Sequence, residues 1–265
     1  MTHGIAGIAV VPMRREPDHP SEMVSQLIFG ETFCIFEKHQ DWLHIRSDWD
    51  GYEGWICRNA CIELSPDEHR KLPVESAVYC TNPLTPVVLS DKKETVWLPF
   101  GSRLPFLGSD MKSFQLGGFR YDLPDSCSLS TNIERDLRNS VIRFAGTLLY
   151  APYLWGGKTY FGTDCSGFVQ TIFRVHHISL PRDAREQAIT GDTVNMLTQA
   201  QPGDLAFFDN ENSEIIHTGI IISSRHIIHA STMVRKDILD HRGIYNENLK
   251  KFTHRLRLVK SVIPL

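Results

Sequence analysis

The spacing of apolar residues along this 265-residue chain changes near residue 131, and this change constrains the fold class. Ahead of it, runs such as ETFCIFEKHQDWLHIRSDWDGYEGWICRNACIEL alternate apolar and polar residues, a period typical of β-strands. Behind it, Leu137, Val141, Phe144 and Leu148 follow helical spacing, and strand-like runs return from residue 204. All-β units followed by helices and then an antiparallel sheet predict an α+β fold.

Turn signals divide the chain into three predicted domains, at residues 1–65, 73–125 and 131–265. The stretch DWLHIRSDWDGYEGWI, with its Asp50-Gly51 hairpin turn, follows the order seen in bacterial SH3 domains, so the first domain resembles one. A second SH3-like barrel is predicted because TPVVLSDKKETVWLPFGSRLPFLG reads as three strands joined by turns. The segment YDLPDSCSLST is the predicted linker to the last domain, whose first helix is predicted to start at a Thr131–Glu134 capping box.

Composition narrows the possible partners and the compartment. The net charge of −3 and the absence of a clustered basic surplus argue against nucleic-acid binding. The start MTHGIAGIAVVPMRREP lacks the features of a signal peptide, and no run is long enough to span a membrane, so we expect a cytoplasmic protein. Its six cysteines are expected to be reduced, and the Cys57/Cys61 pair lacks the further ligands of a zinc site.

The stretch GTDCSGFVQT predicts a reactive cysteine at the start of a helix. Turn residues precede Cys165, and the helical apolar repeat begins at Phe168. A thiol attacks a carbonyl as thiolate, and the positive end of a helix lowers the pKa of a cysteine placed there. Gly167 and the small Ser166 leave room for a substrate, and amides at the helix start are suited to hold an oxyanion. Cys165 is therefore a candidate nucleophile.

The run EIIHTGIIISSRHIIHAS supplies a candidate base. It reads as a hairpin that turns near Ser223, Ser224 and Arg225. With Ser223 at the centre, His217 and His229 oppose each other directly, and a slip of two residues still leaves both on one face. One of these histidines is predicted to be the base for Cys165, and the other to orient its ring.

The last 130 or so residues resemble the NlpC/P60 cysteine peptidases, which have a papain-like fold. The resemblance rests on five stretches in this order: PYLWGGKTYFGTDCSGFVQ, LPRDAREQ, QPGDLAFFD, HTGIII and IIHAS. Together with the SH3-like start, the chain resembles the γ-D-glutamyl-L-diamino acid endopeptidases of this family. This resemblance implies cleavage of murein peptides after L-Ala-γ-D-Glu, in the recycling of cell-wall peptides, through an acyl-enzyme on the cysteine. It implies no metal and no organic cofactor.

The resemblance also assigns roles residue by residue. It makes Cys165 the nucleophile, His217 the base and His229 the orienting partner. Tyr153, Asp164 and Ser166 are expected beside the nucleophile, with Tyr153 near the oxyanion. The residues expected to bind the amino group of the substrate's L-alanine are Asp183, Glu22 and Tyr52. Asp183 is also placed to cap the helix that begins at Ala184.

Two other functions stay open at this point. A related hydrolase could act on intact peptidoglycan outside the cell, although the missing leader disfavours it. A non-catalytic protein could use its SH3 modules to bind the wall, although the complete set of Cys165, His217 and His229 disfavours it. Whether lysine or diaminopimelate follows the bond is not encoded in any motif.

Overall fold

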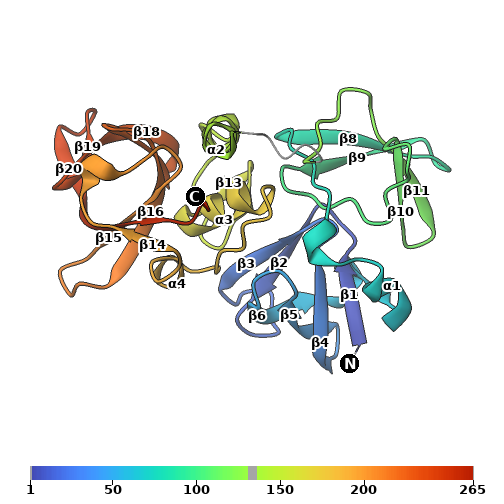
Figure 1. Ribbon diagram of the computed structural model, residues 1–265. Helices are drawn as coiled ribbons and strands as arrows, with labels where there is room; N and C mark the ends of the chain where they lie inside the picture. Colours follow the sequence, from blue (N-terminus) through green and yellow to red (C-terminus); the bar gives the residue numbers. More distant parts are fainter. Residues whose placement is uncertain (1, 131–135, 265) are drawn as a thin grey trace. The chain divides into compact units, whose positions relative to one another are not determined.

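The computed structural model describes residues 2–130 and 136–264, which form two compact units (Figure 1). The N-terminal unit comprises Met1–Asn132 together with Lys158–Tyr160. The C-terminal unit comprises Ile133–Gly157 and Phe161–Leu265. The predicted mixed fold is confirmed, since the chain is mostly sheet with a few helices.

A seven-stranded antiparallel sheet forms the first part of the N-terminal unit, drawn in blue to teal in Figure 1. Its strand order is β3-β2-β6-β5-β4-β1-β7. The elements are β1 (Thr2–Ala6), β2 (Val10–Arg14), β3 (Met23–Ile28), β4 (Thr32–His39), β5 (Trp42–Ser47), β6 (Glu53–Cys57), a 3-10 turn (Arg58–Ala60), β7 (Cys61–Leu64) and α1 (Pro66–Arg70).

The predicted Asp50-Gly51 turn joins β5 to β6. Gly51 has a φ of +70°, and the N–H of Tyr52 donates to Asp50 Oδ1 at 3.1 Å. The two strands then pair with Leu43 opposite Ile56, and both side chains are fully buried. The apolar residues that alternate along these strands point inward and form the hydrophobic core of the predicted SH3 region.

The second part of the N-terminal unit is a four-stranded antiparallel sheet in the order β10-β11-β8-β9. Two of its strands, β8 (Leu84–Leu89) and β9 (Glu94–Pro99), coincide with predicted strands; β10 (Ser113–Leu116) and β11 (Phe119–Asp122) complete it, and a 3-10 turn (Val74–Ser76) precedes it. The third predicted strand, around Ser102–Gly108, is wrong: it makes only a bridge between Arg103 and Tyr79.

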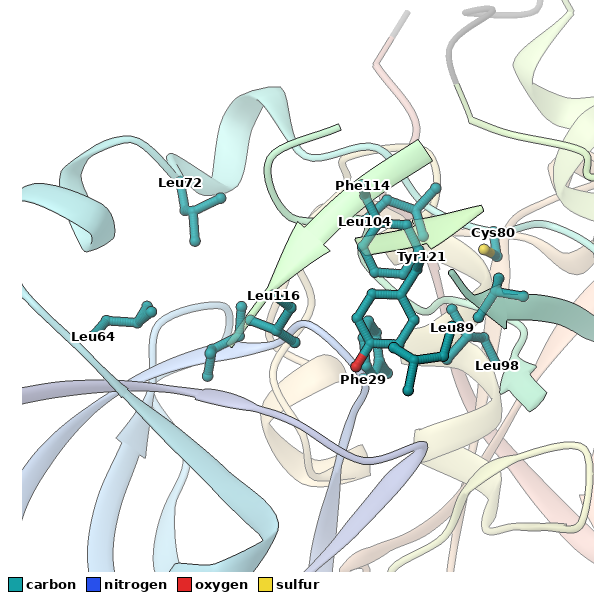
Figure 2. Packing of buried hydrophobic residues seen from close by; sticks show 12 residues of the cluster. Phe29, Leu64, Leu72, Cys80, Leu89, Leu98, Leu104, Phe114, Leu116 and Tyr121 are labelled. Atoms are coloured by element: carbon teal, nitrogen blue, oxygen red, sulfur yellow. The ribbon is translucent and has the colours of Figure 1, made fainter. Parts of the chain in front are cut away.

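The two sheets of the N-terminal unit share one hydrophobic core (Figure 2). Phe29 at the end of β3 lies edge-on to Phe114, with ring centroids 5.7 Å apart, and Phe114 stacks on Tyr121 at 4.7 Å. Because residues from both sheets bury one another's apolar surface, the two sheets stabilise each other.

The C-terminal unit surrounds a seven-stranded sheet in the order β14-β20-β15-β16-β17-β18-β19. β19 also pairs with β20, so six of the strands close into a barrel without open edges. The strands are β14 (Asp192–Val194), β15 (Leu205–Asp209), β16 (Ile215–Ser223), β17 (His226–Ser231), β18 (Met233–Asp240), β19 (Gly243–Asn246) and β20 (Lys251–Ser261).

Helix α3 (Cys165–Arg174) packs against β16 and β17. All ten of its residues are buried, including the predicted apolar face that begins at Phe168. The other elements of this region are α2 (Leu137–Thr147), β12 (Lys158–Thr159), β13 (Gly162–Thr163), α4 (Ala184–Gln187) and a 3-10 turn (Leu197–Gln199). Helix α2 has Asp136 as its N-cap; the predicted Thr131–Glu134 capping box lies outside the described residues.

The strands predicted at 215–223 and 226–231 are confirmed to the residue, whereas β18 and β19 had no counterpart in the sequence prediction. No helix in the described part of the chain is long and apolar enough to cross a membrane. None of the six cysteines, all of which the structure describes, is in a disulfide.

Candidate active site

Cys165 is the first residue of α3, as the sequence predicted. Asp164 is the N-cap, and its Oδ1 accepts a hydrogen bond from the N–H of Gly167 at 2.7 Å. Cys165 is only 7 % exposed, and the backbone amides of Thr218 and Ser166 act to lower the pKa of its thiol. Thr218 directly follows His217 on β16, so strand and helix bring the two predicted catalytic residues into the same place.

A buried ion pair holds the start of this helix. Arg182, 2 % exposed, donates through Nη2 to Asp164 Oδ2 at 2.5 Å and through Nη1 to Oδ1 at 3.1 Å. Its Nη1 also lies 3.0 Å from Ser166 Oγ. Asp164 and Ser166 are thus fixed from inside the protein, and their predicted contacts with substrate amides stay predictions.

Two glycines let the preceding loop reach Asp164. Gly156 has a φ of +77°, and its N–H donates to Asp164 Oδ2 at 2.8 Å. A Cβ on Gly157 would lie 2.4 Å from the carbonyl oxygen of Gly162. The Gly-Gly pair of PYLWGG therefore lets the backbone fold closely over the helix start.

The expectation of a lowered cysteine pKa is wrong. Burial raises the pKa of Cys165 to about 12, and the adjacent Asp164 carboxylate raises it further, against the lowering effect of the Thr218 amide and Arg182. The sequence argument counted the helix end but not the carboxylate that caps it. With this raised pKa the thiol keeps its proton at neutral pH.

His217 and His229 lie on one face of neighbouring strands, as predicted. Nε2 of His217 is 2.8 Å from Nδ1 of His229, and both rings are buried. They are not directly opposed, because the strands turn between Ser223 and His226 and a bulge follows, which leaves Ile220 opposite Ile228. Gly219 lies against His229, where any Cβ would come within 2.7 Å of the histidine Cβ. This glycine leaves space for the second ring.

Asp237 on β18 extends the chain of hydrogen bonds. Its Oδ2 lies 3.0 Å from His229 Nε2, and Arg235 binds the same carboxylate, with Nη2 donating to Oδ1 at 2.8 Å. Burial would raise the pKa of Asp237, but the hydrogen bonds from His229 and Arg235 hold it below its ordinary value. Asp237 is therefore an anion at neutral pH.

The ionised carboxylate of Asp237 determines which nitrogen donates in each hydrogen bond of this series. An ionised Asp237 only accepts, so His229 donates from Nε2, and its Nδ1 then accepts from Nε2 of His217. Nδ1 of His217 is left with a lone pair. Burial lowers the pKa of both histidines, and that of His217 falls well below its ordinary value, so both rings are neutral.

A third imidazole covers His217. His254 on β20 stacks on its ring, with centroids 4.1 Å apart and planes at 24°. Burial, followed by the nearby His229, lowers the pKa of His254 to about 4. Its Nδ1 lies 2.9 Å from Thr253 Oγ1.

Of the remaining predicted site residues, two belong to the C-terminal unit and two to the N-terminal unit. Tyr153 lies near the nucleophile: burial and then Cys165 raise its pKa to about 12, so its hydroxyl keeps its proton. Asp183 is exposed and occupies the N-cap position of α4 without a side-chain capping bond. Glu22 and Tyr52 belong to the N-terminal unit; Glu22 pairs with Arg15 at 2.7 Å and Tyr52 packs on the SH3 core. Their roles in substrate binding stay predictions.

Sequence reasoning missed Arg182, Asp237 and His254. Arg182 adjoins the predicted Asp183, but a buried arginine has no periodic signal. Asp237 lies in MVRKDILD, whose alternation indicates a strand that was not predicted. His254 begins the predicted run HRLRLV. Its contact with His217 could not be predicted, because it forms only once β20 closes the barrel.

Comparisons with known proteins match both parts of the chain. Residues 150–257 match the NlpC/P60 family, and residues 13–60 match the bacterial dipeptidyl-peptidase SH3 domain. The gamma-D-glutamyl-L-lysine dipeptidyl-peptidase of Bacillus subtilis is 28% identical over 218 residues, 78% of this chain and 71% of that protein. Dipeptidyl-peptidase 6 of Lysinibacillus sphaericus is 27% identical over 235 residues, 82% of this chain and 83% of that protein.

The fold also has solved counterparts. An NlpC/P60 family protein from Bacillus cereus superposes with a TM-score of 0.82 at 20% identity, over 99% of this chain and 100% of that one. An NlpC/P60 endopeptidase from Photobacterium damselae gives 0.71 at 15% identity, over 98% of this chain and 71% of that one. At these identities the likeness concerns the fold.

Proposed function

Because the chain is a peptidase that carries an NlpC/P60 domain behind a bacterial SH3 domain, we propose that it cleaves the bond between γ-D-glutamate and an L-diamino acid. The proposed substrates are murein-derived peptides that begin with a free L-alanine, and the proposed setting is recycling of these peptides in the cytoplasm. The relatives named for this activity match over about four-fifths of the chain, which supports the substrate class.

One arrangement carries the reaction type: a buried cysteine at the start of a helix that packs on β16, the strand of His217, whose Nδ1 lone pair is set by His229 and Asp237. When the substrate carbonyl reaches Cys165, Nδ1 of His217 takes the thiol proton as the sulfur attacks. The imidazolium that forms is stabilised through His229 by the Asp237 anion. Deprotonation is thereby coupled to attack, which agrees with the raised thiol pKa.

The remaining steps follow from the same atoms. Attack converts the glutamyl carbonyl into an oxyanion, to which the neutral Tyr153 hydroxyl and an amide at the start of α3 would donate. His217 returns its proton to the amino group of the leaving diamino acid, and the C–N bond breaks. A water molecule, deprotonated by His217, then hydrolyses the thioester and releases L-Ala-γ-D-Glu.

Selectivity for a free amino group would come from anionic partners near the second residue upstream of the cut. Asp183, exposed at the start of α4, is the candidate in the C-terminal unit. A buried ammonium needs such a partner, because leaving the charge unpaired costs several kcal/mol.

The test is a comparison of kcat/KM for L-Ala-γ-D-Glu-L-lysine, its diaminopimelate analogue and their N-acetylated forms. We expect cleavage of the free peptides and loss of most activity on acetylation. Equal cleavage of the acetylated forms, or cleavage of intact peptidoglycan in preference to the peptides, would favour the exported-hydrolase alternative. A wild-type protein that binds the wall without cleaving any peptide would favour the binding-protein alternative.

A further inference from the structure

His254 on β20 lies against the catalytic base but takes part in none of the proposed proton transfers. Its ring is stacked on that of His217, with centroids 4.1 Å apart and planes at 24°. We propose that His254 is a positioning residue of the peptidase: it holds the ring of His217 at one angle and keeps water from the hydrogen bond between His217 and His229. The shielding rests on this geometry alone, whereas its effect on turnover rests also on the proposed function.

The stack restricts rotation of the base about its last side-chain torsion. This torsion is broad in histidine, so the surroundings of the ring decide its angle. The nearly parallel ring of His254 blocks rotation of the His217 ring towards it, and Phe208 on β15 lies with its centroid 5.8 Å from that of His217. At the Nε2 edge, His229 holds the ring at 2.8 Å. These three contacts fix the direction in which Nδ1 presents its lone pair.

His254 is itself held in place, as a residue that positions another must be. The hydroxyl of Thr253 donates to the carbonyl of Ile244 at 3.4 Å, so it accepts from Nδ1 of His254 at 2.9 Å. Ile244 on β19 is also the residue opposite His254 in the sheet. Phe208 lies edge-on to the ring, with centroids 6.0 Å apart. Closure of the barrel by β19 and β20 therefore fixes the ring that covers His217.

His254 also separates the two catalytic histidines from a surface cavity. This cavity of about 570 Å³ is lined by His254 together with Ile216 and Phe252, among others. Its lining includes neither His217 nor His229, which are buried, whereas His254 is only partly buried. Water that enters the cavity therefore meets His254 and not the hydrogen bond behind it. A hydrogen bond kept from water is electrostatically stronger than one exposed to it.

The charge state of His254 is compatible with its place against the base. Burial, followed by the nearby His229, lowers the pKa of His254 to about 4, although Asp237 acts to raise it. The ring is therefore neutral at neutral pH. A positively charged ring stacked on His217 would oppose the imidazolium that forms there during attack. A neutral ring fixes the base without this penalty.

The first test needs no substrate, because it follows the proton shared by His217 and His229. A ring N–H that is hydrogen-bonded and shielded from water gives a slowly exchanging resonance far downfield in the proton NMR spectrum of the full-length protein. We expect this resonance in the wild type and in His254→Phe, which keeps a neutral aromatic plane on the base. In His254→Ala it should be lost to fast exchange with water. His226→Ala, at an exposed histidine of β17, is the matched control and should leave the resonance unchanged.

Turnover of the murein peptides is the second readout. His254→Ala should lower kcat roughly 100-fold with little change in KM, since misplacing a reacting group by about 1 Å can cost that much. His254→Phe should retain most of kcat, and His226→Ala should retain all of it.

The pH profile separates positioning from a general loss of stability. Burial and then His254 lower the pKa of His217, so water admitted by His254→Ala should raise that pKa towards 6.5 and move the acid limb of kcat/KM to higher pH. His254→Phe keeps the burial and should leave this limb nearly unchanged. The other titratable or charged groups around His217 are His229 on β17, Cys165 on α3, which packs on β16, and Asp237 on β18 behind His229, with Arg235 bound to it.

A wild-type protein without the slowly exchanging resonance, or a resonance that survives in His254→Ala, overturns the shielding. An unchanged kcat in His254→Ala, or equal losses in His254→Ala and His254→Phe, overturns the positioning role. Circular dichroism checks that each variant is folded; His254→Gln, whose flexible side chain offers no ring plane, replaces His254→Ala if the latter is not. A wild-type protein that cleaves no murein peptide refutes the proposed function instead, and proton exchange then still decides whether His254 shields the hydrogen bond.

Discussion

Replacing Arg182 with methionine tests whether the buried ion pair holds the nucleophile in place. The change leaves the Asp164 carboxylate buried, with 7 % of its side chain exposed, and removes two of its donors, at 2.5 and 3.1 Å. Breaking a buried pair costs 3–5 kcal/mol, and we expect about 3 kcal/mol here because the amides of Gly156 and Gly167 still donate. That loss corresponds to a fall in Tm of roughly 6–12 °C.

Thermal unfolding of the full-length protein measures this cost, and kcat reports displacement of Cys165. Asp164→Asn combined with Arg182→Met removes the unpaired charge and keeps an N-cap residue, so it should recover part of the stability. Arg138→Met is the matched control, because that arginine pairs with Asp204 at 2.9 Å but its side chain is 22 % exposed; its cost should be smaller. A loss below about 1 kcal/mol for Arg182→Met would refute the reasoning.

Four further outcomes are expected. His217→Ala should lower kcat by several orders of magnitude and His229→Ala by less, because only His217 transfers the proton; the reverse order in steady-state kinetics means that their roles are swapped. Asp237→Asn should lower kcat by roughly 10–100-fold with little change in KM, and an unchanged kcat would remove Asp237 from the relay. Because the pKa of Cys165 is raised to about 12, its alkylation by iodoacetamide should keep rising from neutral to alkaline pH; a plateau near neutrality would indicate a preformed thiolate. If Glu22 binds the substrate amine, Glu22→Ala should cost roughly 2–5 kcal/mol in kcat/KM for free but not N-acetylated peptides, whereas Arg15→Ala should not; equal losses on both peptides would exclude that role.

Local patterns predicted those parts of the fold whose cause is local. Alternation located β16 and β17 to the residue, because both strands are bounded by polar turn residues. The strand predicted near Ser102–Gly108 failed, since apolar residues there enter the core without pairing in a ladder. Strand β18 was overlooked because its alternation includes charged residues, of which Arg235 and Asp237 pair with each other along the strand.

The site residues likewise fall into those that local patterns predicted and those that they missed. Cys165, His217 and His229 could be predicted because a helix start and a hairpin bring them together within short stretches of chain. Arg182 and Asp237 were missed because neither lies in a pattern that was recognised: Arg182 reaches Asp164 from a loop, and Asp237 lies on the unpredicted strand β18, beside His229 on β17. The thiol pKa was mispredicted because complete burial and one capping carboxylate outweigh the helix end.

The most direct test of the central claim is to trap the covalent intermediate. The full-length enzyme is mixed rapidly with L-Ala-γ-D-Glu-L-lysine, quenched with acid and mapped by peptide mass spectrometry. The proposed mechanism predicts an L-Ala-γ-D-Glu thioester on Cys165 that disappears at longer times and is absent with Cys165→Ala. An adduct on another cysteine, an adduct of L-alanine alone, or turnover by Cys165→Ala would contradict it.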